Sequence, residues 1–113
     1  MSGSDFIPPV HLVTNGSMAG DITGPATNFS VQGFSRMSFQ FIWTGTPTGS
    51  FFVDVSQNAT DWAPLPLSPA PVAAGIAGNA FVDAQTGAVY MRVRYVRTSG
   101  TGTLNVIADA KVV

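Results

Sequence analysis

Two strongly alternating runs, joined by a short turn, constrain this sequence more than any other feature. Within residues 36–56, bulky apolar residues stand at every second position: Met37, Phe39, Phe41 and Trp43 in the first run, and Phe51, Val53 and Val55 in the second. Successive side chains of a strand point to opposite sides, so a period of two over this length predicts half-buried β-strands. The link contains Gly45, Pro47 and Gly49, which favour a turn. We therefore predict a β-hairpin at the centre of the chain.

The composition favours an all-β domain. The chain has 113 residues, enough for one compact domain with its own core. It contains 12 glycines and 8 prolines, no glutamate and a single lysine, Lys111. Glycine and proline weaken helices, and the long charged side chains that cover exposed helix faces are scarce. Because the chain lacks cysteine, disulfides, thiolate metal sites and cysteine nucleophiles are excluded.

The remaining segments are consistent with further strands. Residues 89–112 alternate on both sides of the turn at residues 99–102, which predicts a second hairpin. Residues 10–14 form a short predicted strand, closed by a turn at Asn15 and Gly16. Ile22 and residues 28–34 are candidate edge strands. Residues 72–83 favour a strand over a helix, because they contain two glycines and lack cationic residues. Residues 57–71 carry four prolines and are expected to form a surface crossover, with a short extended piece near residues 65–67.

These segments predict a single-domain antiparallel β-sandwich of six to eight strands, of the jelly-roll or Ig-like type. We expect residues 1–8 to form a flexible N-terminal arm and residues 9–113 to form the sandwich. The predicted core consists of alternating apolar residues from both pairs of strands: Met37, Phe39, Phe41, Trp43, Val53, Val55, Val93, Tyr95, Leu104 and Val106.

The sequence offers no catalytic constellation. His11 is the only histidine, so a histidine-based triad or metal cluster lacks partners. The six aspartates form no close pair with the spacing of a calcium loop, and we expect them at turns and solvent-facing positions. We therefore predict that the chain is not an enzyme and that it has no catalytic residues, no cofactor and no metal site.

Arg92, Arg94 and Arg97 are the one cluster of charge, and Arg92 and Arg94 share a strand face with Tyr90. Arginine makes forked contacts to carboxylates, so this stripe is a candidate protein-contact or anion-binding surface. The alternative is a solvated sheet face on which the arginines pair with Asp54 or Asp109 across strands.

Trp62 follows a polar loop and is a second candidate contact residue. An exposed tryptophan can stack against a sugar, although a lone tryptophan after a strand more commonly covers the end of a core. We favour the second interpretation for Trp62.

The charge balance argues against two classes of partner. The net charge is −1, which provides no field for binding nucleic acid or an anionic membrane. The N-terminal residues lack the pattern of a signal peptide, and no apolar run approaches the ~20 residues needed to cross a bilayer. The low charge gives a surface that tolerates close packing against other subunits.

Three segments resemble small all-β structural proteins encoded in the virion modules of tailed bacteriophages. The resemblance lies in the W-T-G-T-P-x-G pattern at residues 43–49, in the stretch from Ser56 to Trp62, and in residues 90–104, where an arginine- and tyrosine-rich strand runs into the turn T-S-G-T-G-T-L. It covers about two-thirds of the chain.

The resemblance implies a non-enzymatic virion protein, and within that class we favour a capsid cement (decoration) protein. Its expected partner is the major capsid protein, its expected state a homodimer or homotrimer, and its expected location the virion, assembled in the bacterial cytoplasm. A tail or baseplate accessory module is one alternative. A carbohydrate-binding sandwich, with Trp62 and Tyr90 as contact residues, is another.

Overall fold

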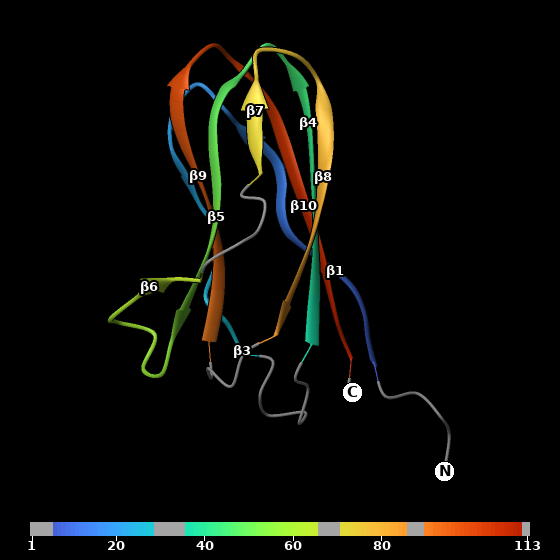
Figure 1. Ribbon diagram of the computed structural model, residues 1–113, viewed down its shortest axis with the longest axis vertical. Helices are drawn as coiled ribbons and strands as arrows, with labels where there is room; N and C mark the ends of the chain where they lie inside the picture. Colours follow the sequence, from blue (N-terminus) through green and yellow to red (C-terminus); the bar gives the residue numbers. More distant parts are fainter. Residues whose placement is uncertain (1–5, 29–35, 66–70, 86–89, 112–113) are drawn as a thin grey trace.

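The computed structural model describes residues 6–28, 36–65, 71–85 and 90–111, which form two antiparallel sheets packed face to face (Figure 1). The β4–β10 sheet has the order β1 (Phe6–Ser17), β10 (Gly102–Lys111), β4 (Arg36–Gly45) and β8 (Gly78–Gln85). In the β5–β9 sheet, β9 (Tyr90–Ser99) and β5 (Thr48–Ser56) are central; β2 (Ile22–Thr23) and β3 (Thr27–Asn28) pair with β9, and β6 (Ala63–Pro64) and β7 (Val72–Ala74) pair with β5. The predicted all-β antiparallel sandwich is confirmed, with six strands of eight or more residues and four of two or three.

Both predicted hairpins are wrong, because each alternating pair of strands is divided between the two sheets. β4 pairs with β10 and β8, whereas β5 pairs with β9. β9 and β10 likewise lie in different sheets. A hairpin and a chain that crosses between sheets both require alternating apolar residues, so the pattern alone does not distinguish them.

The two crossing turns lie side by side at one end of the sandwich (Figure 1). The amide of Thr46 donates a 2.9 Å hydrogen bond to the carbonyl of Thr101. Gly45 and Gly100 have φ angles of 85° and 77°, in the region that favours glycine. The crossings therefore stack on each other, and this stacking aligns β4 with β10 and β5 with β9.

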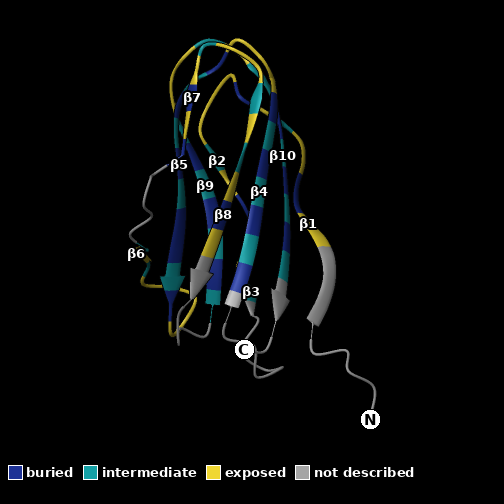
Figure 2. Cartoon of the chain, turned by 45° about the vertical axis from the view of Figure 1, so that its right-hand side comes forward, coloured by how far each residue is buried: buried dark blue, intermediate teal, exposed yellow. Residues whose placement is uncertain are grey.

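The core fills the space between the sheets. Along the central strands, buried residues alternate with intermediate ones, as the colours of β4 show (Figure 2). All ten predicted core residues are buried except Val55, which is partly buried against the core. Phe51 lies at the centre, with its ring centroid 4.9 Å from Phe41, 5.0 Å from Trp43 and 5.1 Å from Tyr95. Met18 is fully buried although it follows the predicted N-terminal strand and belongs to no alternating pattern.

The first strand is longer than predicted. β1 begins at Phe6, which pairs with Lys111, so residues 6–8 of the predicted arm belong to the sheet, while residues 1–5 lie outside the described residues. Asn15 and Gly16 do not close the strand. The register of β1 shifts between Val13 and Gly16, and Asn15 has a φ of 52°, so this pair forms a bulge inside β1.

The edge segments and the proline-rich crossover agree in part with their predictions. Ile22 lies in β2, whereas residues 29–34 lie outside the described residues. The extended piece predicted near residues 65–67 is found slightly earlier, as β6, and residues 66–70 are not described. Residues 72–83 form β7 and the larger part of β8, in agreement with the prediction of a strand.

Candidate protein-contact site on the β5–β9 sheet

The outer face of the β5–β9 sheet holds a buried carboxylate between two arginines. Asp54 on β5 lies directly opposite Arg92 on β9 and diagonal to Arg94. Its carboxylate accepts a 2.9 Å hydrogen bond from Nε of Arg92, and two from Arg94, through Nε at 2.5 Å and Nη2 at 3.1 Å. Asp54 is only 2% exposed, while the Arg92 and Arg94 side chains are 25% and 28% exposed. The sheet therefore fixes both guanidinium groups at the surface.

Two aromatic rings flank this ion pair. The guanidinium carbon of Arg92 lies 4.4 Å from the centroid of the Trp62 ring, and that of Arg94 lies 4.7 Å from the centroid of Phe52. Both distances fall within the range of cation–π attraction. We call these five residues, Phe52, Asp54, Trp62, Arg92 and Arg94, the arginine cluster.

A compact loop between β5 and β6 brings Trp62 back over the sheet. The side-chain oxygen of Asn58 accepts hydrogen bonds from the Ser56 hydroxyl and from the amides of Thr60 and Asp61. The Asn58 amide group donates to the Asp61 carboxylate at 2.9 Å. The polar stretch before Trp62 is thus a turn held together by its own side chains, as asparagine and serine favour.

The structure brings together some of the predicted contact residues and separates others. Arg92, Arg94 and Trp62 meet in the arginine cluster, and Tyr90 stands at the start of β9, opposite Ser56. Arg97 does not join them. It is exposed at the far end of β9, where its Nε donates to the carbonyl of Gly100.

Two interpretations of single residues were wrong. We expected Trp62 to cover the end of the core, but it lies outside the sheet against Arg92, which occupies one face of its ring. We expected the aspartates at turns or solvent-facing positions, but Asp54 is buried. The alternative in which the arginines pair with Asp54 across strands is confirmed. The sequence did contain a signal for the place of Asp54. Asp54 stands two residues after Phe52, so the period of two along β5 puts both side chains on the outward face.

The arginine cluster keeps hydrogen-bond donors for a partner. In the part of the chain that the structure describes, no group accepts a hydrogen bond from Nη1 or Nη2 of Arg92 or from Nη1 of Arg94. The two cations and one carboxylate leave a net charge of +1 that is held rigidly and stacked on aromatic rings. Such a surface is suited to bind the carboxylate of another protein, because arginine donors match carboxylate geometry.

The described residues contain no other arrangement with evident chemistry. His11 is exposed on β1, opposite Ile107. No group of three or more His, Asp or Glu side chains among the described residues is placed to hold a metal ion. These residues also contain no helix that is long and apolar enough to span a bilayer.

Comparison with solved structures finds a similar fold in two proteins of phage origin. It is similar to the PBSX exported protein XepA, with a TM-score of 0.66 and 18% identity over 93% of this chain and 37% of the XepA chain. It is also similar to the SPBc2 prophage-derived protein YomS, with a TM-score of 0.61 and 11% identity over 93% of each chain. At these identities the similarity establishes a shared fold.

The chain thus spans only about 37% of the length of XepA, whereas YomS is matched along almost its whole length. No protein-family model matches the sequence, and no curated protein is similar to it in sequence.

Proposed function

We propose that this protein is a non-enzymatic structural component of a tailed-phage particle, and that it acts as a cement protein on the major capsid shell. The arginine cluster is the observation that carries the proposal. It presents two fixed guanidinium groups on an otherwise charge-poor sheet, with donors that no group among the described residues occupies. Arginines held in this way are the kind of anchor that dominates protein–protein interfaces. The fold shared with phage-derived proteins and the resemblance to virion proteins support the same assignment.

Binding through the arginine cluster requires little reorganisation. Arg94 holds Asp54 with two hydrogen bonds, and Trp62 and Phe52 restrict the two arginines by stacking. A partner carboxylate therefore meets side chains whose rotamer freedom is already reduced, and the entropy cost of association falls. A shell built of many identical subunits repeats such a contact, so each contact needs only modest affinity.

The experiment compares phage particles with and without this protein. We expect gradient-purified particles to contain it in the capsid fraction, and particles from a deletion strain to lose infectivity at a lower temperature. Adding the purified protein back to deleted particles should restore their heat resistance. Absence from purified particles, or unchanged heat resistance after deletion, would contradict the cement proposal. If the protein co-purified with tails instead of capsids, the tail or baseplate alternative would replace the cement proposal.

Two matched variants test the contact site itself. Arg92→Gln removes an arginine of the cluster while Arg94 still holds Asp54, so the sandwich should fold. Arg97→Gln removes the same charge from an exposed position outside the cluster. We expect Arg92→Gln to weaken binding to deleted particles about tenfold or more and Arg97→Gln to bind as the wild type does. Equal binding by all three proteins would place the contact elsewhere.

The carbohydrate-binding alternative is tested by the same site. Because Arg92 covers one face of the Trp62 ring, only the other face remains for stacking against a sugar. Glycan-array binding that Trp62→Ala abolishes in a folded protein would favour this alternative over cementing.

A further inference from the structure

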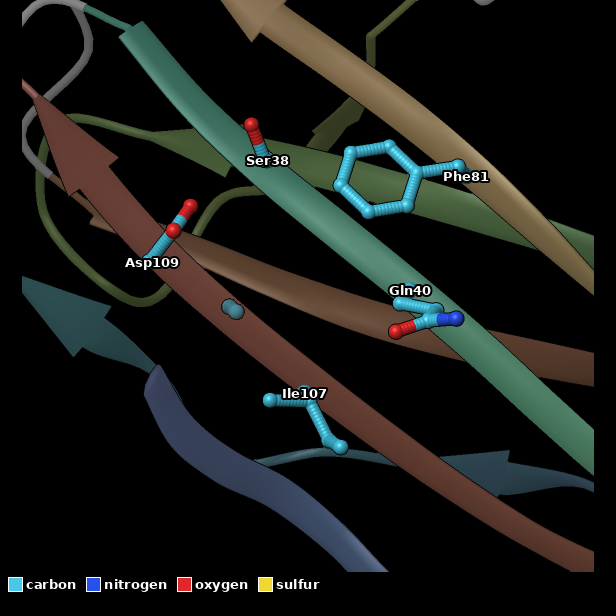
Figure 3. A pocket seen from close by; sticks show the side chains of 6 residues that line it. Ser38, Gln40, Phe81, Ile107 and Asp109 are labelled. Carbon is cyan, nitrogen blue, oxygen red and sulfur yellow. The ribbon is translucent and has the colours of Figure 1, made fainter. Parts of the chain in front are cut away.

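The outer face of the other sheet, formed by β8, β4 and β10, contains a hollow of about 190 Å³ (Figure 3). Its lining consists of Ser38, Gln40, Phe81, Ile107, Ala108 and Asp109. Figure 3 shows the labelled side chains coming from all three strands, with Phe81 on β8, Ser38 and Gln40 on β4, and Ile107 and Asp109 on β10. The hollow thus combines an aromatic wall, an aliphatic wall and polar groups.

Two side chains of the hollow have energetically unfavourable surroundings. Phe81 is 66% exposed, although burial of a phenylalanine side chain is favourable. The Oδ1 atom of Asp109 is buried yet accepts no hydrogen bond from the described residues. A buried carboxylate oxygen without a donor is unfavourable, because it has lost water and gained nothing in return. Both features are expected where a partner completes a surface.

The outer face of the β5–β9 sheet shows which group binds an aromatic ring and a carboxylate together. There, Asp54 is neutralised by arginines whose guanidinium groups stack on Phe52 and Trp62. On the β4–β10 sheet, the carboxylate of Asp109 and the ring of Phe81 stand on either side of the hollow, and no described cation lies between them. The Ser38 hydroxyl, also in the hollow, already donates to Asp83 at 2.7 Å, which adds a second carboxylate nearby.

We propose that this hollow is a second docking site, which binds an arginine side chain of a partner protein. The guanidinium group stacks on Phe81 and donates to Asp109 and to the side-chain oxygen of Gln40, which has no hydrogen-bond partner among the described residues. The aliphatic stem packs against Ile107. Arginine fits this lining better than lysine, because its planar group both stacks on a ring and donates several hydrogen bonds.

A second docking site on the opposite sheet would explain how one small sandwich can hold two neighbours at once. This role in holding two neighbours rests on the proposed function, whereas the arginine-binding site itself does not. The arginine cluster offers cations on one face and the hollow offers a carboxylate on the other, so the two faces select partners of opposite charge.

The test titrates the isolated full-length protein with short peptides and follows backbone amide signals by NMR. The probe peptide has one arginine between glycines, and its matched control carries citrulline, which has the same shape without the charge. We expect arginine-dependent shifts at Gln40, Phe81, Ile107 and Asp109, and at least tenfold weaker binding of the citrulline peptide. Shifts elsewhere only, or equal binding of both peptides, would overturn the proposal.

Three variants make the outcome specific. Asp109→Asn should weaken arginine-peptide binding at least fivefold. Asp21→Asn removes the same charge at an exposed residue whose hydrogen bond from the Arg97 amide an asparagine oxygen can also accept, and it should leave binding unchanged. Arg36 stands on β4 two residues before Ser38. If the Arg36→Gln variant bound the peptide and the wild-type protein did not, Arg36 itself would be the occupant of the hollow and the proposal would be wrong. Circular dichroism establishes that each variant is folded.

This titration is independent of phage particles. If the peptides bind and the particles lack the protein, the docking site stands and the cement proposal fails. If the protein stabilises particles and no arginine peptide binds, the cement proposal stands and the second docking site is excluded.

Discussion

Asp54 and Arg94 are joined by two hydrogen bonds between β5 and β9, and Asp54 is almost entirely withdrawn from water. Arg92 supplies a third hydrogen bond to the same carboxylate. The sheet thus contains a charged group on its outer face that is as buried as the core residues on its inner face. This arrangement exists only because two arginines and the loop that carries Trp62 surround Asp54.

Replacing Asp54 should destabilise the protein more than replacing another aspartate. Asp54→Asn leaves two arginines facing an uncharged amide, and we expect the free energy of unfolding to fall by about 2–3 kcal/mol. The value lies at the lower end for a buried ion pair because the arginines are about a quarter exposed. Denaturant unfolding followed by circular dichroism measures it. Asp21→Asn is the control, because Asp21 is exposed and an asparagine oxygen can still accept the hydrogen bond from the Arg97 amide. A loss of the same size there would mean that the effect at Asp54 is not specific to the buried ion pair.

Removing the amide of Asn58 should release Trp62 from Arg92. The Asn58 side chain joins Ser56 to the backbone of the loop and to Asp61. We expect Asn58→Ala to lower the free energy of unfolding by about 1–2 kcal/mol and to shift the indole NMR signal of Trp62 toward that of a solvent-exposed ring. The indole of Trp43, which donates to the carbonyl of Ile76, serves as the internal reference. An unmoved Trp62 signal would mean that the stacking on Arg92 holds the ring without the loop.

The hydroxyl of Tyr95 should oppose folding. It is buried without a hydrogen-bond partner among the described residues, so Tyr95→Phe should raise the free energy of unfolding by about 1 kcal/mol. A loss of stability instead would reveal a hydrogen bond to this hydroxyl, for example through an ordered water molecule.

Tyr95 should also make the protein sensitive to alkaline pH. Burial raises the pKa of Tyr95 above its ordinary value of 10.0; Arg97 lowers this pKa and Asp21 raises it, both by smaller amounts. Above pH 10 the unfolded chain releases the tyrosine proton while the folded chain retains it, so the free energy of unfolding falls as pH rises from about 10 toward the pKa of the folded state. Unfolding measured from pH 8 to pH 12 should show a shallower decline for Tyr95→Phe than for the wild type. Parallel curves would refute this contribution.

Gly49 should tolerate no side chain. A Cβ at this position would lie closest to the carbonyl oxygen of Val96 and 2.7 Å from both Cε1 and Oη of Tyr95. We expect Gly49→Ala to lower the free energy of unfolding by about 1–3 kcal/mol. Gly20→Ala is the matched control, since a Cβ at Gly20 meets nothing within 4 Å.

A double mutant tests whether the hydroxyl of Tyr95 contributes to this clash. If it does, the double variant Gly49→Ala, Tyr95→Phe should be at least about 0.5 kcal/mol more stable than the sum of the two single effects predicts. Strict additivity would assign the loss at Gly49 to the carbonyl of Val96 and to Cε1 of Tyr95, which phenylalanine retains.

The sequence predicted part of the candidate site. Alternation along residues 90–96 placed Arg92 and Arg94 on one outward face, and pairing with Asp54 was one of the two alternatives considered. The position of Trp62 could not be predicted, because it depends on a loop whose path is set by side-chain hydrogen bonds around Asn58. The separation of Arg97 follows from the alternation itself, because Arg97 stands three residues after Arg94 within β9 and does not share its parity.

The sequence by itself determined which residues face the core and which face outward, because the period of a strand is a local property of the chain. Only the tertiary structure decided which strands are neighbours. The turns near Gly45 and Gly100 carry the chain from one sheet to the other, so Phe41 and Phe51 face each other across the core instead of lying side by side in a hairpin. Pairing is settled by contacts between residues far apart in sequence, and a pattern with a period of two is the same for either arrangement.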